Sequence, residues 1–133
     1  MKCVAVTPEK TVVDRDVKFV VVPLYDGEFG IGAGRSRVIG RLGAGEMRLT
    51  LDDDSVESWY VEGGFVEAAN DTVSLLTNHV CKMKGLSVED AENALQEALK
   101  LPSNSHELAE VKAEAIHRAR AKLRAALKAQ NMY

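Results

Sequence analysis

Glycine is confined to one part of this chain. All ten glycines lie between Gly27 and Gly85, and none follows Gly85. The first part is rich in Val, Gly and Thr, whereas the second is rich in Ala, Glu, Leu, Lys and Arg, which favour helices. This shift predicts an α+β chain, with a β domain over residues 1–84 and a helical domain over residues 85–133.

The first part consists of short apolar runs separated by turn residues. Val17–Val22 is almost wholly apolar and indicates a buried strand that Pro23 ends. Glu46–Leu51 alternates polar and apolar residues, and Asp52–Asp54 follows it as a hairpin tip. About ten short strands at this spacing indicate an antiparallel β-sandwich. The other main strands are predicted at Cys3–Val6, Thr11–Val13, Val38–Leu42, Val56–Glu62, Phe65–Ala68 and Thr72–Thr77.

The second part is predicted to form an antiparallel pair of helices. Ser87 begins the first, because its hydroxyl and Asp90 three residues later have the spacing of a capping box. Pro102 separates the helices, and Asn104 is predicted to cap the second, with Glu107 at its third position. The short connection makes the helices neighbours.

Each predicted helix carries an apolar stripe. A hairpin of about 45 residues is too small to bury a core of its own. It must therefore lie on the sandwich, on a partner, or alternate between them. The stripes are Val88, Ala91, Leu95, Ala98 and Leu99 in the first helix, and Leu108, Val111, Ala115, Ile116, Ala119, Leu123 and Leu127 in the second.

Charge and composition disfavour several functions. A net charge of −3 disfavours nucleic-acid binding, and no apolar run approaches the roughly 20 residues that span a bilayer, so no direct membrane insertion is expected. Cys3, Cys81 and the three histidines lack the spacing of a metal site. No nucleophile, base and metal set is recognisable, which disfavours a small cupin-like or isomerase-like enzyme. We expect no catalytic residues, no metal and no cofactor.

Charge is uneven along the predicted hairpin. Residues 85–114 hold seven acids and two bases, whereas residues 115–133 hold five bases and no acid. One interpretation is a solvated helix end, where cations favour the helix dipole. The other is a basic arm that docks on an acidic partner surface. The bases are Arg118, Arg120, Lys122, Arg124 and Lys128.

Five short strings occur in one order along the first part. Together with a sandwich that precedes a helical hairpin, they resemble the epsilon subunit of bacterial F-type ATP synthase, which corresponds to delta in mitochondria. The strings are Val6–Glu9, Phe19–Pro23, Asp26–Ile31, Leu42–Glu46 and Tyr60–Val66.

The resemblance implies a noncatalytic rotor subunit in the central stalk. Such a subunit binds gamma and the ring of c subunits through its sandwich and couples proton flow to ATP synthesis. It lies at the cytoplasmic face of the inner membrane as a peripheral protein. Its hairpin either folds on the sandwich or extends along gamma and inhibits ATP hydrolysis. A free-standing adaptor, with the sandwich binding one protein and the hairpin another, is the alternative.

The resemblance also assigns a contact with the c ring to the loop 25–37. After Gly30-Ile31 the family continues with a bulky residue, proline, glycine or asparagine, histidine, alanine and proline, whereas this chain has Gly32-Ala-Gly-Arg-Ser-Arg37. Losing the prolines is expected to loosen the free loop, although Gly30–Gly34 could also form tight turns. The contact residues that the resemblance implies are Tyr25, Asp26, Glu28, Phe29, Arg35 and Arg37.

Two further features of the family map onto the helices. Some members bind ATP through a motif with Asp and Arg at the start of the first helix, but Ser87 and Asp90 occupy those positions here. An acid in place of the cation repels phosphate, so we expect weak or absent ATP binding. Basic residues of the last helix face an acidic loop of the beta subunit in the family. The matching residues are Arg118, Arg120, Lys122 and Arg124.

Overall fold

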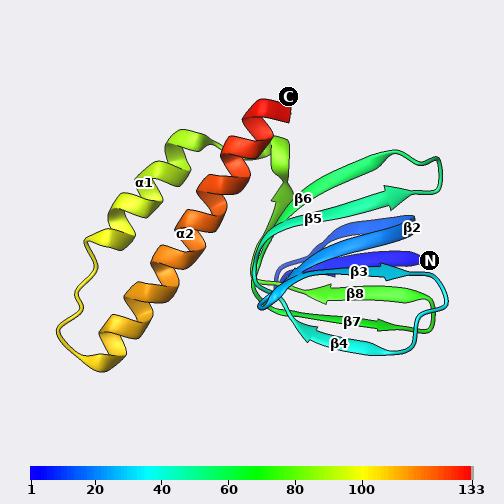
Figure 1. Cartoon of the computed structure of the whole chain (residues 1–133), viewed down its shortest axis with the longest axis horizontal. Helices are drawn as coiled ribbons and strands as arrows, with labels where there is room; N and C mark the ends of the chain where they lie inside the picture. Colours follow the sequence, from blue (N-terminus) through cyan, green and yellow to red (C-terminus); the bar gives the residue numbers. More distant parts are fainter. Residues whose placement is uncertain (133) are drawn as a thin grey trace. The chain divides into compact units, whose positions relative to one another are not determined.

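A computed structural model describes residues 1–132 of the chain (Figure 1). The chain divides into two compact units, and the second begins at Met83. The first unit holds nine strands and the second holds the helices. The division lies two residues before the predicted boundary, because a short 3-10 helix, η1 (Met83–Gly85), belongs to the second unit.

The nine strands confirm the predicted sandwich. One sheet has the order β4-β7-β8-β1-β2 and the other has the order β3-β2-β5-β6-β9. All pairs are antiparallel except β1 with β8. The strands are β1 (Lys2–Val6), β2 (Thr11–Leu24), β3 (Gly27–Gly32), β4 (Val38–Arg41), β5 (Ala44–Leu51), β6 (Val56–Glu62), β7 (Phe65–Ala69), β8 (Thr72–Leu76) and β9 (Val80–Lys82).

Strand β2 is one continuous strand of 14 residues, where two short strands were predicted. The predicted break at Asp14–Asp16 is wrong, because these residues pair with Lys2–Val4 of β1. The predicted stop at Pro23 is also wrong. The Pro23 carbonyl accepts a hydrogen bond of 2.8 Å from Gly43 N, on the side away from β3. Its missing N–H therefore costs no hydrogen bond between β2 and β3.

The sandwich core is built from aliphatic side chains of both sheets. Alternate residues of β2 enter it, among them Val13, Val17, Val20 and Val22. Few aromatic residues are available, and Trp59 is the large aromatic side chain in this core. The period-2 pattern of the strands, rather than individual bulky residues, therefore sets the core.

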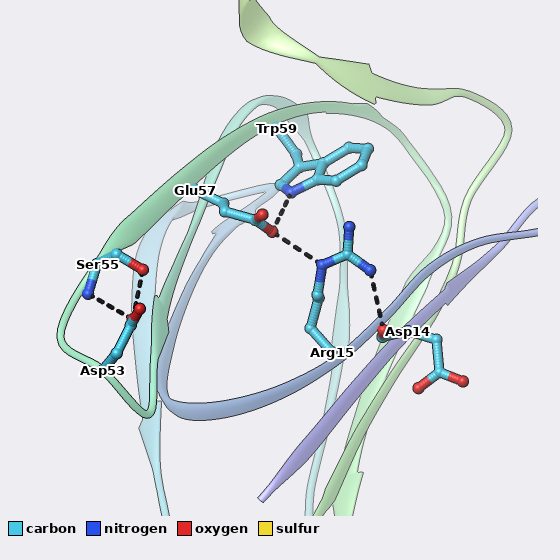
Figure 2. A network of polar contacts seen from close by, with 6 residues as sticks. All are labelled: Asp14, Arg15, Asp53, Ser55, Glu57 and Trp59. Carbon is cyan, nitrogen blue, oxygen red and sulfur yellow. Dashed lines mark hydrogen bonds and ion pairs between the residues drawn. The ribbon is translucent and has the colours of Figure 1, made fainter.

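A polar network joins β2 to β6 outside the hydrogen-bond ladders (Figure 2). Glu57 accepts from the Trp59 indole nitrogen at 3.4 Å and pairs with Arg15 at 3.3 Å. Arg15 also donates to the Asp14 carbonyl. One carboxylate thus ties the half of β2 that pairs with β1 to a strand of the other sheet.

Several tight turns need a left-handed backbone. The predicted tip at Asp52–Asp54 is confirmed, with Asp54 at φ 71° and the Leu51 N–H bonded to the Ser55 carbonyl. The β6–β7 turn also leaves no space for a side chain at one position. Gly64 has φ 101°, and a Cβ there would lie 1.8 Å from the Leu76 carbonyl oxygen. No side chain fits at this glycine.

Each helix begins at the predicted capping residue or one residue after it. Helix α1 (Val88–Leu99) begins at Ser87, whose hydroxyl accepts from the Asp90 N–H at 3.2 Å. Helix α2 (His106–Met132) is capped by Ser105, whose hydroxyl accepts from the Leu108 N–H at 3.1 Å. The predicted cap Asn104 is wrong by one residue, because Ser105 offers an equally suitable oxygen closer to the helix.

The apolar stripes of the helices are only partly buried. Buried side chains are mostly alanines, including several that the stripes omitted. Four predicted stripe residues, Leu99, Leu108, Val111 and Leu127, are exposed instead. The buried alanines are Ala91, Ala98, Ala119, Ala121, Ala125, Ala126 and Ala129.

Replacing Gly64 by Ala is expected to lower the free energy of unfolding by about 2–4 kcal/mol, because the added Cβ must displace backbone. Gly27→Ala is the matched control, since Gly27 also has positive φ but has no atom within 4 Å of the place that its Cβ would take. That variant should cost about 1 kcal/mol. Urea denaturation of both variants checks this, and equal costs would contradict it.

Candidate functional site

The predicted contact loop is largely a strand. Residues 25–37, here called the tongue, contain a turn at Tyr25–Asp26, then β3, then the segment 33–37. Strand β3 pairs with β2 from Phe19 to Leu24. The alternative of tight turns over Gly30–Gly34 is therefore wrong for Gly30–Gly32. The pairing arises because β2 continues through Pro23 and offers a complete edge.

Glu28 is held by an arginine from another strand. Its carboxylate accepts from Arg48 of β5 at 2.9 Å, and Arg48 also bonds Glu46 at 3.1 Å. The hydrogen bond to Glu28 is the main cause that raises the pKa of Arg48; desolvation opposes it, and the weaker effect of the bond to Glu46 adds to it. Glu28 therefore stands on the tongue as a charge with a fixed position.

Arg35, Arg37 and Tyr25 of the tongue each contact an aromatic or charged side chain. The Arg35 guanidinium lies 4.4 Å from the Phe29 ring centroid, a cation–π contact within the tongue. Arg37 pairs with Glu67 of β7 at 3.1 Å, which joins the tongue to the other sheet. Tyr25 is exposed and lies under Arg41 at 4.3 Å. The structure thus brings Phe29 and Arg35 together, while Asp26 is exposed at the turn.

An exposed apolar patch lies on the sheet that contains β7 and β8. Phe65 and Leu76 are cross-strand partners, and 59% and 64% of their surfaces are exposed. Val6 pairs with Leu76 on one side, and Arg41 pairs with Phe65 on the other. These four residues, here called the Phe65–Leu76 patch, line an open groove together with Pro8 and Asn78.

Sequence reasoning missed this patch and the partners Arg41, Arg48 and Glu67. Each of these residues belongs to a strand other than the one it supports. Only the register of β4, β5 and β7 brings them to the tongue or to the patch. A period-2 pattern shows which residues share a face of one strand, but it does not show which strand lies beside it.

The predicted basic arm divides between two faces of α2. Arg120, Arg124 and Lys128 are spaced by four residues and form one stripe, whereas Arg118 and Lys122 form another. Arg118 pairs with Glu114 at 3.9 Å, and Lys122 is half-buried. The two stripes cannot meet one flat surface together.

The described residues offer little for chemistry at a metal or a thiol. Within residues 1–132, no group of three or more His, Cys, Asp or Glu could hold a metal ion. None of the described helices is long and apolar enough to cross a membrane. Cys3 is buried, and this burial raises the pKa of its thiol to about 12. The features that remain are surfaces of contact: the tongue, the Phe65–Leu76 patch and the basic stripes.

The fold defines a class of chain in which a β-sandwich precedes a helical hairpin. A family model described as "ATP synthase, Delta/Epsilon chain, beta-sandwich domain" matches residues 1–83. Over 125 residues the chain is 42% identical to the ATP synthase epsilon chain of Rhodopirellula baltica, covering 94% of this chain and 97% of that one.

Two solved structures share the fold. A chain in the Euglena gracilis mitochondrial ATP synthase structure of OSCP, F1 and c-ring has a TM-score of 0.79 at 20% identity, covering 94% of this chain and 79% of that chain. A chain in the Tetrahymena thermophila mitochondrial ATP synthase structure of central stalk and c-ring has a TM-score of 0.74 at 13% identity. It covers 95% of this chain and 96% of that chain.

The chain therefore belongs to the ATP synthase delta/epsilon family. Within this family it is an epsilon-type subunit, a noncatalytic component of ATP synthase. The resemblance that the five ordered strings indicated is confirmed, and so are the α+β fold and its order of sandwich then helices.

Cys3 is expected to resist thiol reagents in the folded protein. A pKa of about 12 leaves roughly one thiolate in ten thousand at pH 8, and the side chain is closed to solvent. A Cys81→Ser variant isolates Cys3. Its reaction with a chromogenic disulfide should be slow in buffer and should become fast in denaturant, whereas fast reaction of the folded variant would contradict the burial of Cys3.

Proposed function

We propose that this chain works in the central stalk of ATP synthase and helps couple ion flow to ATP synthesis. The sandwich contacts the gamma subunit and the ring of c subunits, at the cytoplasmic face of the inner membrane, as a peripheral protein. The observation that carries this proposal is the family match over residues 1–83, which covers both the tongue and the Phe65–Leu76 patch.

The tongue is proposed to contact the c ring. It carries Asp26, Glu28 and Arg35 along one edge of a sheet, and polar side chains of this kind suit the polar loops of a ring. Glu28 is held by Arg48, and Arg35 lies on Phe29. Side chains that already have fixed positions lose less freedom when a partner binds.

The Phe65–Leu76 patch is proposed to contact gamma. Two large apolar side chains, each more than half exposed and paired across strands, leave an apolar surface that a partner would remove from water. The patch and the tongue both involve β4, because Arg41 pairs with Phe65 and lies on Tyr25. Contacts between the two sheets of one sandwich can therefore join two partners and transmit torque between them.

The helical hairpin is proposed to inhibit ATP hydrolysis when it extends toward the catalytic head. The stripe of Arg120, Arg124 and Lys128 suits an acidic loop of the beta subunit better than the four predicted bases together, because those four divide between two faces. ATP is not proposed as a ligand of α1. The Ser87 hydroxyl is engaged by the Asp90 N–H, and the Asp90 carboxylate repels phosphate.

Contact with gamma is tested with the double variant Phe65→Ser and Leu76→Ser. Its affinity for an F1 sector that contains gamma should fall about tenfold or more, because an apolar contact is lost from the centre of the interface. Val56→Ser is the matched control, since Val56 is 59% exposed but lies on β6. Equal affinities would refute the gamma assignment, and no binding by the wild type would favour the free-standing adaptor.

Inhibition is tested by ATP hydrolysis of the reconstituted complex. A chain stopped after Lys84, and separately Arg120→Glu with Arg124→Glu, should raise hydrolysis while binding to gamma persists. The control pair Arg118→Glu with Lys122→Glu changes the other stripe by the same charge and should have a smaller effect. Unchanged hydrolysis in the truncated chain would show that the bases are only a solvated helix end.

A further inference from the structure

Phe19 of β2 lies over the glycines of the tongue. Phe19 is the register partner of Gly32, and Val21 is the partner of Gly30. A Cβ on Gly30 would lie 2.6 Å from the Phe19 Cζ, and a Cβ on Gly32 would lie 3.5 Å from its Cδ2. The ring therefore fills the space that a side chain at Gly30 would occupy, and it lies within contact distance of Gly32.

The two faces of β3 are held differently. Ile31 is buried in the core and Phe29 packs against it, so one face is anchored by β3's own side chains. The opposite face carries Gly30 and Gly32, which have no side chain to pack. Phe19 supplies that packing, although 42% of its surface remains exposed.

Strand β3 lies at an edge of its sheet and, within residues 1–132, lacks a second neighbouring strand. Among the described strands it pairs with β2 alone, so a single ladder holds it. Glycine weakens a strand because it loses more backbone freedom on folding and buries nothing. An aromatic ring laid across a glycine from the neighbouring strand offsets this weakness. Gly32 stands where the family that this chain resembles has a bulky residue, and here the Phe19 ring lies beside this position.

We propose that Phe19 is a positioning residue that keeps the tongue ordered for its contact with the c ring. The inference rests on the proposed function of the tongue. By covering Gly30 and Gly32, Phe19 offsets the loosening that the loss of the family's prolines would cause. Glu28, two residues before Gly30 and on the same face of β3, thereby keeps its place against Arg48.

The test replaces Phe19 by Ala in the full chain. Hydrogen exchange of the Phe29 and Ile31 amides, whose N–H groups face β2, should become about tenfold faster or more, while exchange in β7 and β8 stays unchanged. Affinity for the purified c ring should fall about tenfold, because the tongue must then be ordered on binding. Affinity for an F1 sector with gamma but no ring should not change. Val56→Ala is the control, an exposed apolar side chain on β6, which β5 and β2 separate from β3.

A second variant separates positioning from direct contact. In the Phe19→Ala background the space above Gly30 is open, so Gly30→Ala adds a side chain to β3 that the native ring forbids. The double variant should recover both amide protection and affinity for the ring. Recovery of protection without affinity would show that Phe19 touches the partner itself and would overturn the inference.

The remaining outcomes are also decisive. Unchanged exchange of the Phe29 and Ile31 amides in Phe19→Ala would overturn the inference, whatever the affinity. A further outcome is that the wild type fails to bind the c ring, while Phe19→Ala still speeds hydrogen exchange in the tongue. That result would refute the proposed function of the tongue, but the positioning role of Phe19 would remain.

Discussion

Strand β2 is shared by both sheets, and the other features of the sandwich depend on this sharing. Its first half pairs with β1, and its second half pairs with β5 and β3. The register shifts between Val17 and Phe19, where the strand passes from one sheet to the other. Continuous hydrogen bonding along 14 residues fixes how the sheets meet, and the contact between Arg15 and Glu57 adds a second link between them.

The tongue inherits its position from this strand. Each of its charged anchors reaches a different neighbour: Glu28 reaches β5, and Arg37 reaches β7. Exposed ion pairs of this kind contribute little to stability, commonly under about 1 kcal/mol. Their effect is on geometry, since they restrict where the charges of the tongue lie before any partner arrives. A charged surface with fixed geometry favours selective recognition more than strong binding.

Much of this fold could be predicted because local chemistry determines it. The Asp52–Asp54 tip and the Ser87 cap depend on nearby residues alone, and both are confirmed. The pairing of the tongue was missed because glycines favour turns unless another strand covers them, and Phe19 supplies that cover from outside the segment. The apolar patch was missed because strand register creates it: Phe65 and Leu76 lie at opposite ends of consecutive strands yet are direct partners. Resemblance to a family identifies segments that make contact, but strand pairing decides which side chains share a face.

The two units also differ in which apolar side chains they bury. The sandwich buries Val, Leu, Ile and Met from both sheets in one cluster, whereas the buried residues of α1 and α2 are mostly alanines. Burying one methyl group contributes only about 0.8 kcal/mol, and larger residues such as Leu99 and Val111 remain exposed. The helical unit therefore keeps apolar surface that a different partner can cover. A sandwich with a large buried core, joined to helices that bury mostly alanines, is a physical basis for the coupling and regulatory roles proposed for this subunit.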